Sequence, residues 1–312
     1  MLKSSNVAPA CSSRFRARGS GLAAILVFVL AAPTEAALTG AEKLALVYDS
    51  ILSARFDRAD AQLKQACPPA PADACRTLGV ASLWWQIQID PDNRSRDGLL
   101  NERARAAVKA AEAWTKREPR NAEAWFYLAS SYAPLVEWQV LRGERIGAAR
   151  NGNRIREALE QALRVDPALA DARFGIGIYQ YYAGVASTAA KMFRWLLLLP
   201  GGDRAKGLEA IDSTRRSGAL LRAEADYQRY IIDIWYEHKP DDALAILRSL
   251  DSRYPTNPLF LQRIAETYDS YVHDARASAA AWQMLIDRAR RNGVYDSTRV
   301  LALAERQRRA LF

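Results

Sequence analysis

Cysteine is the first residue type in this sequence that could carry chemistry. Cys67 and Cys75 are separated by seven residues, three of which are prolines. Two thiols this close are expected to form a disulfide in an oxidising compartment. Free thiols and a redox-active pair are the alternatives. A thioredoxin-type redox motif has only two residues between its cysteines, so the longer spacing favours a structural disulfide between two helices.

Histidine is equally scarce, because His238 and His273 are the only two in 312 residues. Both stand in polar surroundings that are typical of exposed residues and helix ends. Paired acids such as Asp241 and Asp242 are expected to cap the starts of helices. The motifs of serine hydrolases, zinc proteases, phosphate-binding loops and dinucleotide sites are absent from the sequence. We therefore expect a protein that is not an enzyme, with no catalytic residues, no metal site and no cofactor.

The elements that hold these residues are expected to be helices. From Ala37 onward, apolar residues recur with the 3.6-residue period of an amphipathic helix, and β-branched alternation is nearly absent. Proline and glycine fall between the periodic segments rather than inside them. The pattern predicts an all-α fold.

The spacing of small and large residues repeats along the chain. Ala243, Leu247 and Leu250 lie 12, 8 and 5 residues before Pro255, and Tyr227 lies 28 residues before it. The next stretch continues the frame with Ile264, Ala265, Tyr268 and Ala277. Small residues at such positions let two antiparallel helices approach closely, large residues fill the space between them, and proline ends the second helix.

These offsets resemble those of the tetratricopeptide repeat (TPR) superfamily, whose 34-residue unit is a helix pair. The resemblance implies a right-handed helical-repeat solenoid of about six TPR-like antiparallel helix pairs over residues 37–312. Units 224–257 and 258–291 fit cleanly. Degenerate or lengthened units fall at 41–67, 73–119, 122–167 and 170–217, and a terminal helix is expected at 296–310.

In a TPR protein the first helices of the pairs line a concave groove. The frame places these residues in a partner-binding groove: Phe126, Phe174, Ile178, Tyr181, Tyr182, Gln228 and Trp235. An aromatic groove suits an extended peptide or an apolar helix face. The alternative is that long insertions, such as residues 133–146, fill the groove from inside and make these aromatics ordinary core.

A glycine-rich segment stands inside the fourth unit. Its residues are Gly201, Gly202, Asp203, Arg204, Gly207 and Leu208. It is either a turn in which Asp203 caps a helix or an anion cradle of backbone N–H groups beside Arg204. The segment resembles an element of a TPR-like family of lipid-linked and outer mitochondrial membrane proteins, which implies an interaction or lipid-associated role. Gly175 and Gly177, on the preceding helix, indicate a close backbone approach.

Three further features each have two interpretations. One of the adjacent residues Trp84 and Trp85 must point away from its helix pair, so a partner or a neighbouring repeat should cover it. The apolar segment 192–199 is too short to span a bilayer and is either a buried helix or a contact with a membrane surface or partner. The arginine-rich runs 288–291 and 306–309 belong either to a solvated capping helix or to a basic patch for lipid headgroups or an acidic partner.

Residues 1–36 have the three parts of a secretory signal peptide. A basic start is followed by a 12-residue apolar run from Gly21 to Ala32 and by small residues before a predicted cleavage after Ala36. The alternative is an uncleaved anchor, although spanning a bilayer takes roughly 20 residues. The Ala- and Arg-rich composition is typical of GC-rich bacteria, so we expect the periplasm. Without this leader the formal net charge falls from +9 to +6, and the remaining basic residues alternate with acids, which argues against nucleic-acid binding.

These patterns predict a non-catalytic, exported TPR scaffold that binds a protein or peptide partner in the cell envelope. The alternative is an envelope protein that binds a hydrophobic ligand or associates with lipid. Residues 174–182 and the apolar run 195–199 motivate that alternative.

Overall fold

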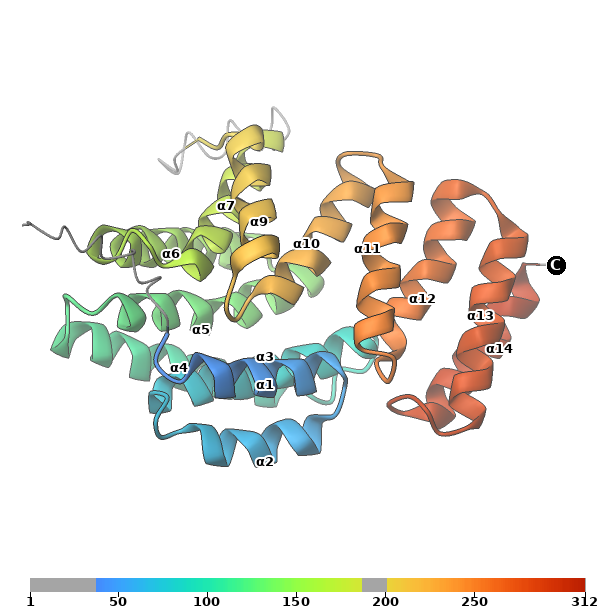
Figure 1. The fold of residues 1–312 in the computed structure, drawn as a ribbon, viewed down its shortest axis with the longest axis horizontal. Helices are drawn as coiled ribbons and strands as arrows, with labels where there is room; N and C mark the ends of the chain where they lie inside the picture. The colour runs from blue at the N-terminus through green and yellow to red at the C-terminus, as the bar shows by residue number, and fades with distance from the viewer. Residues whose placement is uncertain (1–37, 187–200, 312) are drawn as a thin grey trace, which may run out of the picture. The chain divides into compact units, whose positions relative to one another are not determined.

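The computed structural model describes residues 38–186 and 201–311, so the predicted leader lies outside the described residues. Within them the chain is all-helical and contains no strand, which confirms the predicted all-α class (Figure 1). The helices are α1 (Ala41–Leu52), α2 (Phe56–Ala66), α3 (Ala72–Ile89), α4 (Asp97–Arg117), α5 (Ala122–Leu141), α6 (Arg145–Val165), α7 (Ala170–Val185), α9 (Arg204–Ser217), α10 (Arg222–Trp235), α11 (Pro240–Arg253), α12 (Pro258–Thr267), the π-helical turn η1 (Tyr268–Val272), α13 (Ala275–Arg290) and α14 (Ser297–Ala310).

Consecutive helices pack against one another along the described chain, from α1 on α2 to α13 on α14. Figure 1 shows α10, α11, α12 and α13 alternating in direction as antiparallel neighbours. Small residues such as Ala243 and Ala265 are fully buried where these helices meet. The small-and-large pattern of the sequence therefore has the packing role that was expected of it.

Prolines end several helices where the sequence predicts an end. Helices α4, α6 and α11 each stop two residues before a proline, at Pro119, Pro167 and Pro255. Proline disfavours the α conformation in the residue before it and lacks the N–H that would continue the helix.

Polar side chains start several helices. Asn121 accepts hydrogen bonds from the backbone N–H groups of Glu123 and Ala124 at the start of α5. Asp203, Asn257 and Asp274 cap α9, α12 and α13 in the same way. Each cap satisfies backbone donors that have no partner inside the helix.

The expectation that proline and glycine stay between helices is wrong for the longer helices. Pro134 lies inside α5 and Gly152 lies inside α6, whereas Gly177 lies on α7, the helix on which it was expected. The extra residues 133–146 therefore mostly lengthen α5 rather than form a separate insertion. Tertiary packing overrides the helix propensity of these residues, because α5 buries residues on both sides of Pro134.

Cys67 and Cys75 form the predicted disulfide, with 6.4 Å between their Cα atoms. Cys67 follows the last residue of α2, and Cys75 lies in the first turn of α3. The bond ties the two helices together across the proline-rich turn.

Helices from opposite ends of the described chain also meet. The hydroxyl of Tyr254, after α11, donates to Asp49 on α1 at 2.8 Å. The buried amide of Asn257 donates to the backbone oxygen of Leu52 at 2.8 Å, while its oxygen caps α12. Arg299 on α14 donates to the backbone oxygen of Ile89, the last residue of α3. Early helices therefore pack against late ones as well as against their sequence neighbours.

Candidate functional site

The predicted groove residues fall into two groups in the structure. Phe126, Phe174 and Tyr181 are buried, so they are core residues and offer no surface to a partner. Ile178, Tyr182 and Gln228 are half-buried, and Trp235 is the one of the seven that is exposed. The prediction of an open aromatic groove is therefore wrong for the three buried residues. The chain's own helices fill the space, and the lengthened part of α5 contributes Glu137, which accepts a hydrogen bond from Gln228.

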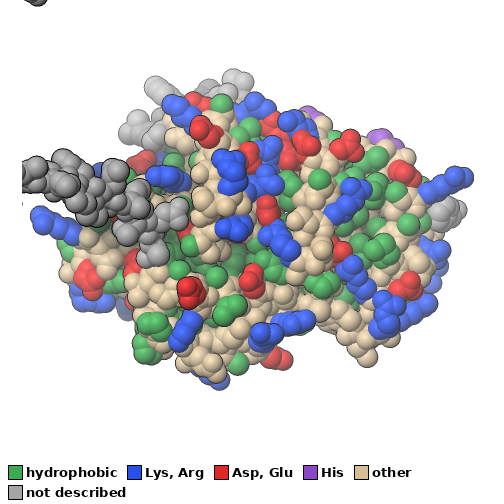
Figure 2. Space-filling view, in the orientation of Figure 1, with side chains coloured by type: hydrophobic (Ala, Val, Ile, Leu, Met, Phe, Trp, Pro, Cys, Tyr) green, Lys and Arg blue, Asp and Glu red, His purple; other side chains and the backbone are tan. Residues whose placement is uncertain are grey.

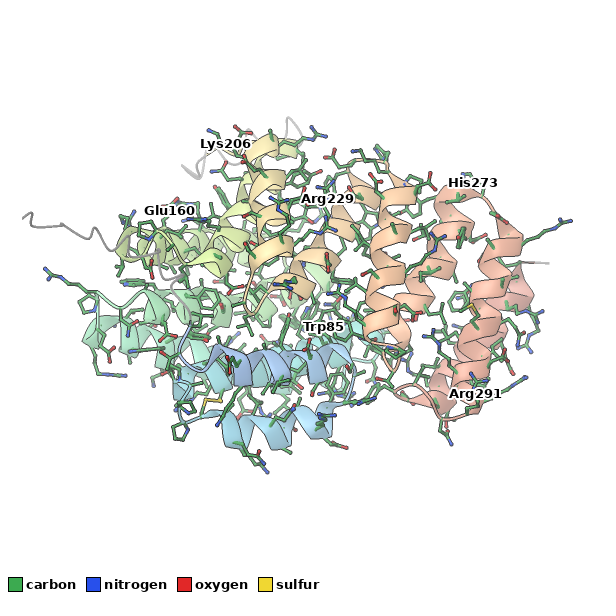
Figure 3. All side chains as sticks on the ribbon, in the orientation of Figure 1. Trp85, Glu160, Lys206, Arg229, His273 and Arg291 are labelled. Atoms are coloured by element: carbon green, nitrogen blue, oxygen red, sulfur yellow. A yellow bond between two sulfur atoms is a disulfide. The ribbon has the colours of Figure 1, made fainter. Side chains whose placement is uncertain are left out.

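Trp84 and Trp85 show how the filling occurs. Both side chains are buried, as the expectation of a covering neighbour requires. The ring of Trp85, labelled in Figure 3, packs against Tyr227 on α10 and Phe260 on α12, at centroid distances of 5.1 and 6.1 Å. These helices lie far along the chain rather than in the next pair. The inner faces of α3, α10 and α12 thus form one aromatic core.

A polar cluster lies beside this aromatic core. The hydroxyl of Tyr48 on α1 donates to Glu224 on α10 at 2.6 Å. The amide of Gln228 donates to Glu224 at 3.2 Å and to Glu137 on α5 at 3.1 Å. Gln228 thus bridges two carboxylates that come from helices far apart in sequence. We call Tyr48, Glu137, Glu224 and Gln228 the inner carboxylate cluster.

Burial controls the proton affinity of this cluster. Loss of water around Glu137, together with the nearby charge of Glu224, raises the pKa of Glu137 well above its ordinary value. Burial also raises the pKa of Glu224, against the hydrogen bonds from Tyr48 and Gln228. Each of the two carboxylates therefore binds a proton more tightly than an exposed glutamate does. The cluster can hold a proton, but none of its four residues lines either of the two surface hollows described below.

An exposed aromatic surface begins where this core ends. The rings of Tyr181, Tyr182 and Tyr236 contact one another edge to face, with centroids 5.3 to 5.9 Å apart. Trp235, the last residue of α10, is 61% exposed and Tyr236 is 43% exposed. We call Tyr182, Trp235 and Tyr236 the aromatic edge. Large exposed aromatics beside a packed aromatic cluster are typical of interaction surfaces.

The glycine-rich segment packs α7 and α9 at very short range. A Cβ on Gly207 would lie 2.6 Å from the backbone nitrogen of Tyr181, and one on Gly202 would lie 2.2 Å from the backbone oxygen of Gln180. A Cβ on Gly177 would meet Ala210 at 2.9 Å. The close approach predicted from the helix glycines is therefore present, and it explains the glycines without a ligand.

Asp203 and Arg204 are likewise used within the chain. Asp203 caps α9 by accepting from the backbone N–H of Lys206, and its own N–H donates to Gln180. Arg204 binds the buried carboxylate of Glu237 through two hydrogen bonds, and Tyr181 donates to the same carboxylate at 2.5 Å. These bonds lower the pKa of Glu237, Arg204 contributing most. The contacts support a turn and helix cap at residues 201–204, not an anion cradle.

Charged residues elsewhere are mixed in sign (Figure 2). Arg229, labelled in Figure 3, pairs with Asp212 on α9 and with Asp233 on its own helix. Asp226 bridges Arg215 on α9 and Arg253 on α11. These ion pairs join the outer sides of α9, α10 and α11.

The arginine-rich runs near the C-terminus are only partly free. Arg288 forms two hydrogen bonds with Asp251, and Arg290 pairs with Glu305 on α14.

His238 and His273 are exposed and lie just beyond the ends of α10 and η1. The apolar segment 192–199 lies outside the described residues, and with it the run 195–199 that helped to motivate the lipid-associated alternative.

Metal-binding clusters and membrane-spanning helices are both absent from the described part of the chain. No group of three or more His, Cys, Asp or Glu in residues 38–186 and 201–311 is arranged to hold a metal ion. None of the helices in those ranges is both long and apolar enough to cross a membrane.

The comparison with known proteins adds no relative. No protein-family model and no curated protein sequence matches this chain.

Sequence reasoning missed Glu137 and Glu224. Glu137 is one of only two charged residues in α5. It lies in the stretch 133–146, which the repeat pattern treats only as extra length. Glu224 stands on the face of α10 that carries Tyr227 and Gln228, one turn away. An acid on an otherwise apolar face is the signal that could have found both.

Proposed function

We propose that the protein is an exported, TPR-like helical-repeat scaffold that binds a protein or peptide partner. The helix boundaries support the repeat assignment. Helices α10 and α11 occupy the unit expected at 224–257, α12 to α13 the unit at 258–291, and α14 the terminal helix at 296–310. The remaining pairs, α1–α2, α3–α4, α5–α6 and α7–α9, fall in the four degenerate units. Together these are the six pairs of the proposed solenoid.

The aromatic edge is the binding surface in this proposal. The single observation that carries it is the exposure of Trp235, because its neighbours along α10 that face the core are buried. Tryptophan and tyrosine bury large areas at protein interfaces and lose little side-chain entropy on binding. The buried groove residues Phe126, Phe174 and Tyr181 pack the helices against one another, and in this proposal the partner binds the exposed aromatic edge.

The disulfide supports the export part of the proposal. Bonds such as Cys67–Cys75 persist in oxidising compartments and are rare where thiols are kept reduced. The leader predicted at residues 1–36 directs the chain to such a compartment.

Chemical crosslinking in the envelope of the producing cell tests this function. We compare the wild-type chain with Trp235→Ala and with Met284→Ala, because Met284 on α13 is also exposed, at 51%. The proposal expects adducts with a partner protein that disappear in Trp235→Ala and persist in Met284→Ala. Adducts that persist unchanged in Trp235→Ala would show that the aromatic edge is not the binding surface.

A further inference from the structure

A pocket on the opposite side of α5 from the inner carboxylate cluster has no role in the proposed scaffold function. It lies among α4, α5 and α6 and has a volume of about 320 Å³. Three basic side chains line it: Arg105 and Lys109 on α4, and Arg154 on α6. A second hollow of about 430 Å³ adjoins it and shares Glu112, Tyr132 and Arg154 with it; Glu157, Glu160 and Arg164 also line this second hollow.

The charges in the pocket are not balanced. Glu112 is the single acid among the residues that line it, against three cations. None of the three cations forms an ion pair with any described residue. All three are exposed side chains around the hollow, and unpaired cations clustered in this way attract an anion.

Arg154 is held in place without being neutralised. Its guanidinium lies over the ring of Tyr132, 5.7 Å from the centroid, and one of its nitrogens is 3.4 Å from the Tyr132 hydroxyl. That hydroxyl in turn donates to Glu112 at 3.0 Å. Burial and this hydrogen bond raise the pKa of Tyr132. The only acid of the pocket is thus occupied by a tyrosine, and the arginine is oriented by an aromatic ring.

The floor of the pocket carries two buried amide side chains that are bonded to each other. Gln139 and Asn151 both line the pocket and are each only 9% exposed. The amide of Asn151 donates to the oxygen of Gln139 at 3.1 Å, which fixes the orientation of the Gln139 amide. Among the described residues, the buried side-chain donors and acceptors without a partner are on Trp84, Tyr127, Trp138 and Ser278, so the Gln139 amide is not an unsatisfied buried donor.

Gly147 makes room for this amide. A Cβ at position 147 would lie 2.5 Å from the Gln139 nitrogen, so any larger residue would displace it. The pocket thus combines an oriented amide with three exposed cations, which together can bind a negatively charged oxygen.

We propose that this pocket binds the phosphate monoester of a small organic molecule. A formal excess of two positive charges matches a phosphate monoester, which carries about −1.5 to −2 at neutral pH. The fork of an arginine suits phosphate oxygens, and the Gln139 amide supplies a neutral donor. Val108 and Leu135 beside the cations, and Trp125 and Leu128 in the adjoining hollow, provide an apolar wall for the organic group.

Calorimetric titration of the full chain with phenyl phosphate tests the proposal, with inorganic phosphate and phenol as comparison probes. Phenyl phosphate should bind saturably and more tightly than either, and its affinity should fall as salt is added. Arg154→Gln and Lys109→Gln should each weaken binding about tenfold, because each removes a charge-assisted contact.

Arg103→Gln is the matched control, because Arg103 is exposed on α4 but does not line the pocket. It should leave the affinity within about twofold of the wild type, since only a screened surface charge is lost. Circular dichroism of each variant checks that the helices remain. Absence of saturable phenyl phosphate binding, or equal weakening by Arg103→Gln and by the two pocket variants, would overturn the proposal.

Discussion

Tyr48 on α1 donates a hydrogen bond to Glu224 on α10, with 2.6 Å between the two oxygens, although 176 residues separate them in sequence. Both side chains are buried. A bond of this kind requires the first helix of the described chain to lie against one from its last third. The same closure buries Trp85 and explains why an aromatic inner face is core rather than an open groove.

Tyr48→Phe should destabilise the fold by about 1–3 kcal/mol, because it removes a hydrogen bond to a buried carboxyl group. Urea denaturation measures the difference in the free energy of unfolding. Tyr236→Phe is the matched control, since the Tyr236 side chain is 43% exposed, and it should change stability by less than about 0.5 kcal/mol. Equal stability of the Tyr48→Phe variant and the wild type would contradict the role given to this bond.

Glu137→Gln should make stability less dependent on pH. In the unfolded chain Glu137 ionises near 4.5, whereas in the fold burial and Glu224 raise its pKa. The folded chain therefore holds the proton more tightly, so stability falls as pH rises from about 4.5 through the raised pKa and stays lower above it. The variant lacks this loss, and its new amide oxygen still accepts the hydrogen bond from Gln228.

The measurement is the melting temperature of both proteins from pH 5 to pH 8. The advantage of Glu137→Gln over the wild type should grow with pH across this range. Glu102→Gln, at an exposed position on α4, should show no such trend. An advantage that shrinks with rising pH would refute the assignment of a raised pKa to Glu137.

Local features of the fold were predictable from the sequence, but the contacts between early and late helices, such as α1 with α10, were not. Pro119, Pro167 and Pro255 indicate where helices end, because proline acts within a few residues. The spacing of the two cysteines likewise predicts the disulfide, because Cys67 and Cys75 are only eight residues apart in sequence.

Burial of Phe174 and Tyr181 depends instead on residues of later helices, such as Ile211 on α9 and Ile232 on α10. The residue periodicity of a single helix does not indicate which other helices will cover its apolar face. An inward-facing aromatic has the same spacing whether it lines a groove or fills a core. The inner carboxylate cluster was missed for the same reason, since Tyr48 and Glu224 become neighbours only through closure.

Gly207→Ala should destabilise the fold by about 1–3 kcal/mol through overpacking of α7 against α9. The new methyl group would lie 2.6 Å from the backbone nitrogen of Tyr181, and backbone cannot rotate away as a side chain can. Gly152→Ala on α6 is the control, because a Cβ there meets nothing within 4 Å. It should stabilise the protein by about 0.5–1 kcal/mol, as alanine does inside a helix. Thermal unfolding of the two variants decides the question, and a stabilised Gly207→Ala variant would rule out the close crossing.

Replacing both Cys67 and Cys75 by serine should lower the free energy of unfolding by about 2–3 kcal/mol, because the short loop is then no longer closed in the unfolded chain. Denaturation of the wild type with and without reductant should give the same difference. Thiol labelling of protein from the envelope should find neither cysteine reactive before reduction. Labelled Cys67 in unreduced protein would contradict the exported, disulfide-bonded state.

The most direct test of the central claim places a photoreactive amino acid at position 235 in one variant and at position 284 in another. Both positions are exposed, so neither replacement disturbs the core. Irradiation of the envelope of the producing cell should give a partner adduct from position 235 and none from position 284. Adducts from position 284 alone, or from neither position, would contradict a partner-binding aromatic edge at the end of α10.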